Sequence, residues 1–439
     1  MRTWNLVACL VAFLTILLLS VIFQHNMFDV VGVFAKVKAL RGKAQNVTQI
    51  GSGLGNRILN MASAFLYALL TNRVLLVEHE TDMADLFCQP FPNTSWLLPL
   101  DFPVKNELRR LNQHSPNRYG NLLRNNIINA STVSPPSLLY LFLAFNCDDY
   151  DKLFYCDDQQ MFLQKIPWLI VKSDEYFIPF LFLIPTFKQE LDKMFPDKET
   201  VFHHLGRYLF HPSNKAWGLI TRFYQSYLAK ADERIGIQIR VFDPKASPFE
   251  VVIDQILACT LKEKLLPEVD KARFIASPSE NRTSKAILIA SLYPEFYDNI
   301  RNIYWTFPTL SGEVIGVYQP SHEQYQHFGD SMHNMKAWVE MNLLSLSDVL
   351  VTSSWSTFGY VAQALGGLNP WILYKPENQM TPNPPCRKAI SMEPCFHFAP
   401  SFDCKAKANA DMGTIFPHVK HCEDATSGLK LVNDHSSHI

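Results

Sequence analysis

The sequence predicts an α/β protein with two domains, each built on a parallel sheet. Its second half alternates apolar strands with helices, which is the pattern of a doubly wound sheet. Its first half contains a glycine-rich segment followed by a helix and a strand, which is half of a βαβ unit. The chain has 439 residues, whereas one hydrophobic core rarely serves more than about 250 to 300 residues. We therefore expect two cores.

The N-terminal segment predicts a membrane anchor. Residues 6–23, LVACLVAFLTILLLSVIF, form an uncharged run of 18 residues, close to the roughly 20 that span a bilayer. A signal-peptide core has a similar composition, but this run is longer than usual and no small-x-small cleavage site follows promptly. We expect a cytoplasmic tail at 1–5, an uncleaved signal anchor at 6–23 and a short stem at 24–48.

Sequons and cysteines favour a lumenal compartment for the rest of the chain. The eight cysteines beyond Cys9 are an even number, as a disulfide-permissive compartment favours. The basic residues within 36–43 do not favour this orientation by charge alone. Predicted N-glycosylation sites are Asn46, Asn93, Asn129 and Asn281.

The first domain is expected at 49–205. A helix is predicted over 56–71, because its apolar residues recur near the 3.6-residue period, and the apolar strand RVLLVEHE follows at 73–80. PWLIVKSDEYF at 167–177 predicts a buried strand. The signals over 104–155 are weak and polar.

The second domain is expected at 206–375. Five apolar strands and four helices alternate in it, which indicates a parallel sheet covered on both faces. The predicted strands are 233–243, 285–291, 313–318, 348–353 and 370–375, and the predicted helices are 248–265, 293–305, 333–347 and 356–365.

The sequence of the C-terminal part predicts a disulfide-linked extension followed by a tail. Residues 376–422 are rich in proline and contain four cysteines without CxxC spacing, which favours disulfides over zinc. Their connectivity is left open. The polar residues 423–439 are expected to be disordered. A net charge of -1 with 18% charged residues excludes the basic field that nucleic-acid binding requires.

Arg240 is the first candidate for binding chemistry. It lies near the carboxyl end of the strand GIQIRVFD, and ligands of open α/β sheets bind beyond the carboxyl ends of strands. A buried guanidinium needs an anionic partner. An anionic ligand and an ion pair with Asp243 or another carboxylate are equally compatible with this position.

The segment VTSSWSTFGYVAQAL is the second candidate. A strand ends at Ser353 and Ser354, and a helix begins near Ser356 and Thr357, so free backbone amides and hydroxyls suit a phosphate or diphosphate. Ordinary N-capping by Ser356 is the alternative.

The glycine-rich loop GSGLGNR is the third candidate. Gly53 and Gly55 permit close backbone approach, Asn56 can cap the following helix, and Arg57 can reach outward. The loop lacks a GxGxxG register after a recognisable strand and a Gly-Lys-Ser/Thr sequence, so a simple glycine turn is the alternative.

Carboxylates supply the acid/base candidates. Asp174 and Glu175 end a predicted strand and can orient a hydroxyl nucleophile or accept its proton, although such residues often only cap a helix. Asp149 and Asp151 form a DxD sequence like that of metal-dependent sugar-nucleotide transferases. In a chain with 41 acidic residues such a pair arises by chance, and we interpret it as a solvated turn.

The sequence resembles the plant cell-wall fucosyltransferases, which fucosylate galactosyl units of xyloglucan and arabinogalactan. The similarity runs over about 52–407. It is carried by an ordered series of blocks that includes GLGNRIL, DMADLFCQPFPNTSWLLP, IGIQIRVFD, EVIGVYQPSHE, SLSDVLVTSSWSTFGYVAQALGGL and SMEPCFH.

This resemblance implies a type II Golgi membrane protein of GT-B fold, in which two Rossmann-like domains face a cleft. It also implies transfer of fucose from GDP-fucose to the 2-hydroxyl of galactose, with inversion and without a metal or other cofactor. The implied partners are a galactose-containing cell-wall polysaccharide and the Golgi membrane, with a homodimer or other Golgi glycosyltransferases as protein partners.

The resemblance also assigns roles to residues of this chain. Arg240 is expected to contact the diphosphate, and Asp174 to face the acceptor hydroxyl. Ser356, Thr357 and Phe358 are expected at the phosphate and nucleotide, and Gly53, Gly55, Asn56 and Arg57 along the cleft.

The sequence departs from this family just before the glycine-rich loop. Members carry an apolar strand there, whereas KVKALRGKAQNVTQIGSG is polar, so the first strand of the first domain is expected to be missing or replaced. That departure supports an alternative function as a truncated, catalytically silent relative serving as partner subunit or glycan-binding scaffold. Another sugar-nucleotide transferase is the second alternative.

Overall fold

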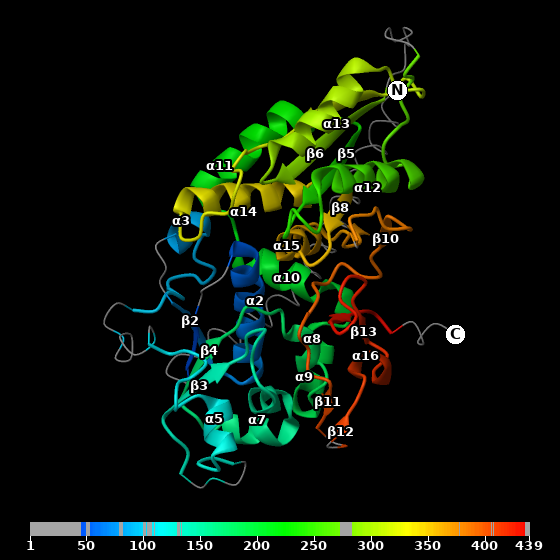
Figure 1. Ribbon diagram of the computed structural model, residues 1–439. Coiled ribbons are helices and arrows are strands. Elements are labelled where there is room, and N and C mark those ends of the chain that lie inside the picture. Colours follow the sequence, from blue (N-terminus) through cyan, green and yellow to red (C-terminus); the bar gives the residue numbers. More distant parts are fainter. Residues whose placement is uncertain are drawn as a thin grey trace, which may run out of the picture.

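The computed structural model describes residues 45–49, 53–78, 82–99, 102, 108, 110–129, 132, 134–272, 283–376, 378–404, 406 and 408–434. The predicted cytoplasmic tail at 1–5, the predicted anchor at 6–23 and Asn281 lie outside these residues. Within them, no helix combines the length and apolar character needed to cross a bilayer. Figure 1 shows two α/β lobes joined by helices that include α2 (Leu54–Leu70), α10 (Val201–Leu209) and α15 (Thr357–Gly366).

The first domain is built on a four-stranded parallel sheet in the order β2-β1-β4-β3. These strands are β1 (Gln45–Gln49), β2 (Val74–Val77), β3 (Leu138–Phe142) and β4 (Trp168–Lys172). Helices follow as α3 (Met83–Leu86), α5 (Tyr119–Arg124), α6 (Asp149–Lys152), α7 (Asp157–Leu163), α8 (Ile178–Leu181) and α9 (Pro185–Met194), with 3₁₀ turns at Leu153–Tyr155 and Lys198–Thr200.

Strand β1 corrects the expectation that the first strand is missing. It lies directly before the glycine-rich loop, inside the range 24–48 assigned to the stem and up to Gln49, and it pairs with β2 on one side and β4 on the other. A polar segment forms this strand because its backbone is paired on both sides, and such tertiary pairing overrides weak strand propensity. The sequence also failed to indicate β3, whose LLYLF residues are largely buried.

The second domain is a doubly wound sheet, as predicted. Its order is β10-β9-β8-β5-β6-β7, and all pairs are parallel except that of β10 with β9. The strands are β5 (Glu233–Ile239), β6 (Ser284–Ser291), β7 (Val314–Tyr318), β8 (Val349–Ser353), β9 (Trp371–Leu373) and β10 (Cys386–Lys388). The helices are α11 (Asn214–Phe223), α12 (Phe249–Lys262), α13 (Pro294–Thr306) and α14 (Ser331–Ser345), with a π-helical segment at Tyr224–Leu228.

The order of this sheet determines where a ligand binds. The connections from β5 lead to β6 and β7 on one side, and later to β8 and β9 on the other, so the strand order reverses between β5 and β8. A crevice forms at such a switch point beyond the carboxyl ends of the strands. Arg240 follows β5 and Ser353 ends β8, so both belong to this crevice.

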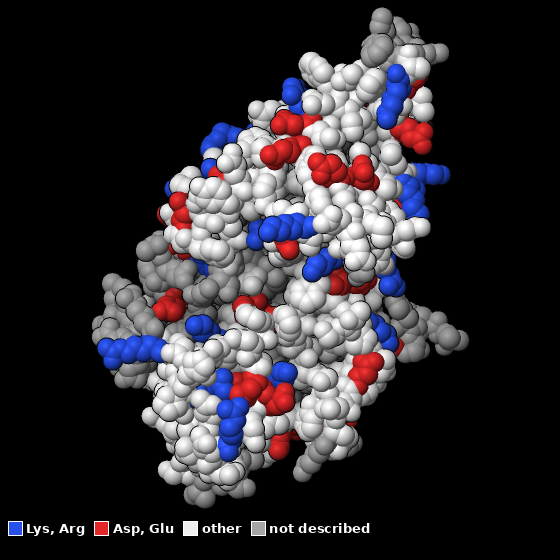
Figure 2. Space-filling model, in the orientation of Figure 1, with Lys and Arg blue, Asp and Glu red and all other residues white. Residues whose placement is uncertain are grey.

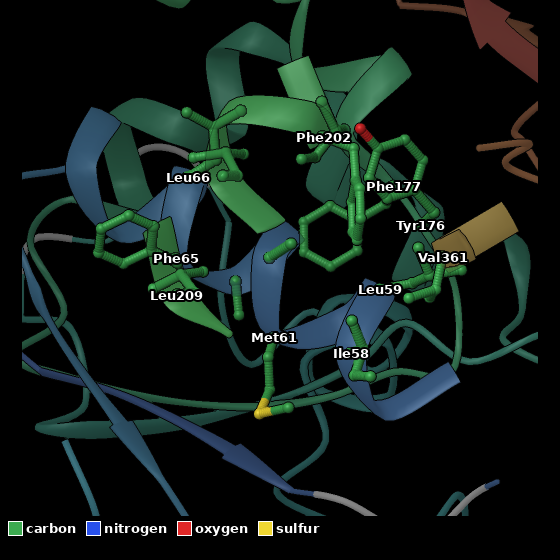
Figure 3. Packing of buried hydrophobic residues seen from close by; sticks show 14 of the residues in the cluster. Ile58, Leu59, Met61, Phe65, Leu66, Tyr176, Phe177, Phe202, Leu209 and Val361 are labelled. Atoms are coloured by element: carbon green, nitrogen blue, oxygen red, sulfur yellow. The ribbon is translucent and has the colours of Figure 1, made fainter. Parts of the chain in front are cut away.

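The largest buried core extends across both domains. Helix α2 buries 15 of its 17 residues, so it is a central helix surrounded by protein. Figure 3 shows side chains of α2, α10 and α15 meeting in one cluster, among them Leu59, Phe202 and Val361. This shared packing fixes the first turn of α2 against the second domain.

The C-terminal segment returns to the first domain, where it runs beside α8 and α9 in Figure 1. It forms β11 (Phe402–Asp403), β12 (Ala408–Asn409), α16 (Met412–Ile415), β13 (Val419–His421) and β14 (Leu429–Leu431). Disulfides join Cys156 to Cys404, Cys259 to Cys386 and Cys395 to Cys422. The four C-terminal cysteines are thus in disulfides, as predicted. Cys88 and Cys147 are free thiols.

The predicted disorder over 423–439 is wrong for residues 423–434. Leu429 and Leu431 of β14 are buried against the main core. Lys430 Nζ lies 2.9 Å from a Glu423 carboxylate oxygen, and both side chains are only 2% exposed. These contacts stabilise a segment whose composition is polar. Residues 435–439 lie outside the described part of the chain.

Candidate active site

A cleft of about 510 Å³ opens between the two domains. The end of β5, the start of α15 and the start of α2 line it together with the residues after β4, and the C-terminal segment adds His397 and Phe398. On the face shown in Figure 2, basic and acidic side chains are interspersed, so its described residues form no cationic patch of the kind that binds nucleic acid.

Arg240 carries a positive charge into the cleft. One terminal guanidinium nitrogen lies 3.0 Å from Gln326 Oε1, and the guanidinium carbon lies 5.3 Å from the centre of the Phe242 ring. Among the described residues no carboxylate forms an ion pair with Arg240, so the alternative pairing with Asp243 does not occur. Burial lowers the pKa of Arg240, yet a guanidinium keeps its charge in proteins. The half-buried Arg240 guanidinium is therefore placed to contact an anionic ligand in the cleft.

The first turn of α15 lies beside Arg240 across the switch point. The Ser353 hydroxyl accepts the Arg240 backbone N–H at 2.9 Å, which fixes the end of β5 to the end of β8. Ser356 is the N-cap of α15, and its hydroxyl accepts the Gly359 N–H at 3.5 Å, a long cap. The other amides of a first helical turn have no intrahelical acceptor, so they are available to an anion.

The start of α2 packs directly against the start of α15. The Thr357 hydroxyl donates to Asn56 Oδ1 at 2.6 Å. A Cβ added to Gly55 would lie 2.7 Å from Thr357 Oγ1 and 3.0 Å from the Phe358 nitrogen, closer than side-chain carbons approach such atoms. Gly55 is thus required for the contact between two helix starts, and Gly53 lies close to Gln326, the residue that bonds Arg240.

The predicted position of Arg57 along the cleft is wrong. Its side chain is buried, and its guanidinium makes two bonds to the Asp82 carboxylate, at 2.8 and 3.0 Å. Asn334 of α14 donates to the same carboxylate at 2.7 Å, which links the two domains. Arg57 points away from the cleft because this buried, paired carboxylate satisfies its charge. Gly53, Gly55 and Asn56 do line the cleft.

Asp174 and Glu175 line the cleft just beyond β4, opposite the second domain. Asp174 Oδ1 accepts the Phe145 backbone N–H at 2.9 Å, and burial raises the Asp174 pKa. Burial, with the neighbouring Asp174 charge, raises the pKa of Glu175 to about 8, although backbone amides of His397 and Phe398 oppose this rise. Glu175 is therefore mostly protonated at neutral pH, whereas Asp174 is the better proton acceptor.

The DxD sequence has a structural role away from the cleft. Asp148 caps α6 in a capping box with Asp151, and Asp151 is fully buried and paired with Arg118. Only Asp149 is strongly exposed. The interpretation of this segment as a solvated turn is thus wrong at Asp151, because the helix cap draws that carboxylate inside. Neither aspartate of the motif lines the cleft.

Several cleft residues were not singled out from the sequence. Gln326 lies in the loop before α14, and Glu340 lies in α14. Trp355 belongs to the segment VTSSWSTFGYVAQAL, but the sequence assigned it no role. His397 is the last residue of the SMEPCFH block, which was noted only for its resemblance to the family, and Phe398 follows it. Burial raises the pKa of Glu340 to about 8, and the Ser321 hydroxyl donates to it at 2.6 Å.

The predicted glycosylation sites occupy different environments. Asn93 and Asn129 are exposed in loops of the first domain, where a glycan fits without disturbing packing. Asn46 lies within β1, the strand between β2 and β4, so it is the least suitable of the described three.

Comparison with known proteins gives a consistent set of relatives. The sequence profile of the xyloglucan fucosyltransferase family matches residues 38–405. A galactoside 2-alpha-L-fucosyltransferase of Pisum sativum is 61% identical over 87% of this chain and 67% of its own length. An Arabidopsis thaliana protein of that name is 58% identical, over 87% of this chain and 68% of its own.

A solved structure is also similar to this chain over most of its length. It is a mutant of Arabidopsis thaliana FUT1 in complex with GDP, with 55% sequence identity and a TM-score of 0.82. The match covers 91% of this chain and 87% of that one.

Proposed function

Because this chain belongs to the xyloglucan fucosyltransferase family, we propose that it transfers fucose from GDP-fucose to the 2-hydroxyl of a galactosyl residue in cell-wall xyloglucan or arabinogalactan. The observation that carries this proposal is the pairing of Arg240 with the first turn of α15. Arg240 has no carboxylate partner among the described residues, and it lies beside free helix amides. Positive charge and free amides together suit the negatively charged diphosphate of a nucleotide sugar.

The leaving group determines what the second domain contributes. When the bond between the fucosyl anomeric carbon and the diphosphate breaks, negative charge grows on the departing phosphate oxygen. Arg240 and the amides at the start of α15 stabilise that charge without reorganising, and one such donor typically contributes about 3 to 4 kcal/mol. Thr357, anchored by Asn56, keeps that helix start aligned with the first domain.

The acceptor side uses a carboxylate of the first domain. The galactosyl 2-hydroxyl attacks the anomeric carbon from the face opposite the diphosphate, so the configuration inverts, and its proton passes to Asp174. Glu175 is poorly suited to this step, because its pKa of about 8 leaves it protonated at neutral pH. The backbone N–H of Phe145 orients the Asp174 carboxylate.

The proposed reaction needs no metal ion, because Arg240 and the helix amides are placed to neutralise the diphosphate. The proposed location is the Golgi membrane in type II orientation, with the cleft in the lumen. Three disulfides and the exposed Asn93 and Asn129 support a lumenal site, since disulfides persist in oxidising compartments.

A transfer assay tests this function directly. The full-length chain, produced in a secretory host and purified in detergent, is given GDP-fucose with galactosylated xyloglucan or with arabinogalactan, each with and without EDTA. We expect GDP release that depends on one acceptor and persists in EDTA. Acceptor-dependent activity lost in EDTA would replace the metal-free mechanism.

GDP binding separates the enzyme from a silent relative. A ligand that binds only the folded state raises its melting temperature. A folded protein whose melting temperature GDP does not change would favour a glycan-binding scaffold or partner subunit. The support for that alternative was the expected loss of the first strand, and β1 occupies that position.

A further inference from the structure

Three aromatic side chains are exposed in the cleft beside the carboxylates. Phe145, Phe398 and Trp355 are 56%, 40% and 37% exposed, although side chains of this size are usually buried. The Phe398 ring centre lies 5.9 Å from that of Phe145 and 5.9 Å from that of Trp355. The ring planes of Phe145 and Trp355 are inclined to that of Phe398 by 51° and 73°. The three rings therefore form an angular apolar wall, which we call the aromatic platform.

The platform connects the two chemical sites of the cleft. At one end, the Phe145 backbone N–H bonds the Asp174 carboxylate. At the other end, Trp355 immediately precedes Ser356, the N-cap of the phosphate-binding helix. A sugar ring packed against one face of the platform would therefore be held between the proton acceptor and the leaving group.

The chemistry of a galactosyl ring fits this surface. Its C–H bonds on one face are apolar and slightly positive, and they pack on the electron-rich faces of aromatic rings, while its hydroxyls point to the rim. Asp174 and Glu175 of the first domain line the cleft and can meet such hydroxyls. Apolar walls with few convergent polar groups are typical of small-molecule sites.

We propose that Phe145, Trp355 and Phe398 bind the acceptor galactosyl unit by stacking, and that Asp424 is a positioning residue that holds Trp355 in the platform. This inference rests on the proposed fucosyltransferase function and specifies how the same cleft selects its acceptor.

Trp355 is held in an unfavourable backbone conformation. Its φ is 61°, a left-handed value that is uncommon for a bulky residue. Asp424 Oδ2 accepts the Trp355 backbone N–H at 2.8 Å and the Tyr360 hydroxyl at 2.6 Å, and the indole N–H donates to the Asp424 carbonyl. The His397 ring stacks on the indole at 4.6 Å. Strain of this kind persists only where surrounding contacts enforce it.

The C-terminal segment supplies both groups that hold Trp355. His397 and Asp424 each lie two residues beyond a cysteine of the Cys395–Cys422 disulfide. The C-terminal segment thus fixes the Trp355 indole beside the start of α15.

Substitution of Phe398 tests the platform. Phe398→Ala is expected to raise the acceptor KM about tenfold, as the loss of one aromatic stacking contact implies, with the stabilisation by GDP unchanged. Phe398→Tyr keeps the ring and is expected to retain a near-normal KM. Trp305→Ala removes an aromatic ring that is 80% exposed on α13, outside the cleft, and serves as the matched control.

Asp424 is tested by measuring the acceptor KM together with the stabilisation by GDP. Asp424→Ala is expected to raise the acceptor KM by a similar factor while GDP still stabilises the protein, and Asp424→Asn, which keeps an oxygen acceptor for the Trp355 N–H, is expected to recover most of the loss. A normal acceptor KM in Phe398→Ala would overturn the platform, and failure of Asp424→Asn to recover would overturn the positioning role. If the unsubstituted protein transfers to no galactosyl acceptor, the proposed function fails first.

Discussion

Arg240 is the residue on which donor chemistry depends most directly. We expect Arg240→Ala to reduce kcat at least about 100-fold, because a preorganised donor to the developing charge is lost. Arg222→Ala, which removes an exposed arginine of α11, is the matched control and should retain activity. Near-normal transfer by a folded Arg240→Ala protein, measured by GDP release, would contradict the assigned role.

Asp82 illustrates a residue whose contribution is to stability. Although its burial opposes ionisation, the bonds from Arg57 and Asn334 hold its pKa below the ordinary value. Removing it as Asp82→Ala leaves the buried Arg57 without this carboxylate, which we expect to cost about 3 to 5 kcal/mol of unfolding free energy.

Chemical denaturation measures this loss. Asp85→Ala, an exposed aspartate of the same helix, should change stability by less than about 0.5 kcal/mol. Equal stability of the Asp82 and Asp85 variants would show that the Arg57 pair contributes little.

The sequence predicted the positions of those site residues that directly follow a recognisable strand. Arg240 and Ser356 follow recognisable apolar strands, so the sequence placed both at the crevice. Arg57 was misplaced because its partner Asp82 is 25 residues away in a stretch with no clear pattern. A local motif does not indicate which distant carboxylate a guanidinium meets.

At the scale of elements, the junction of α2 and α15 aligns the two halves of the cleft. Gly55→Ala would place a methyl group 2.9 Å from the Thr357 carbonyl carbon and 3.0 Å from the Phe358 nitrogen, both of them backbone atoms that cannot rotate away. We expect a loss of about 1 to 3 kcal/mol of unfolding free energy and reduced transfer, because α15 must shift.

A second helical glycine provides the control. In Gly218→Ala the new methyl group meets only the end of the flexible Arg222 side chain, at 3.1 Å. That variant should be neutral or more stable by up to about 1 kcal/mol, since alanine favours helix. If thermal denaturation shows the same change for both variants, the tight junction at Gly55 is not a constraint.

The elements of the second domain were predictable because their strands are uniformly apolar and alternate with helices. The first domain was harder. Strand β1 is formed by polar residues that pair with β2 and β4, and these neighbours lie about 30 and 120 residues further along the chain. Pairing at such distances leaves no signature in a local window, so strand propensity alone suggested a gap.

At the scale of the whole molecule, a buried carboxyl attaches the C-terminal segment to the first domain. Glu393 is fully buried within it, and its carboxyl accepts the Tyr176 hydroxyl at 2.5 Å and the Phe202 N–H at 2.8 Å. Burial raises its pKa to about 8, although these bonds and the Lys430 charge oppose the rise. Disorder was predicted for part of this segment because its stabilising partners lie in the first domain.

The Glu393 pKa predicts a pH dependence of stability. Its folded value of about 8 exceeds the ordinary 4.5, so its contribution is complete below about pH 4.5 and is lost as pH rises through 8. Glu393→Gln mimics the protonated acid and does not titrate. We expect its melting temperature to fall less between pH 6 and pH 9 than that of the unsubstituted protein.

Parallel melting curves check this expectation. Glu263→Gln is the matched control, because Glu263 is the C-cap of α12 and is not fully buried, and it should follow the unsubstituted protein. Identical pH slopes for the Glu393 variant and the unsubstituted protein would mean that Glu393 is already ionised when folded.

The most direct test of the central claim is the structure of the product. Full-length protein is incubated with GDP-fucose and a galactosylated oligosaccharide, and the product is examined by NMR. Nucleophilic attack across the cleft from Arg240 and α15 predicts a single new fucosyl residue in α configuration on the galactosyl 2-hydroxyl. A β linkage, attachment to another hydroxyl, or release of free fucose without transfer would contradict the account.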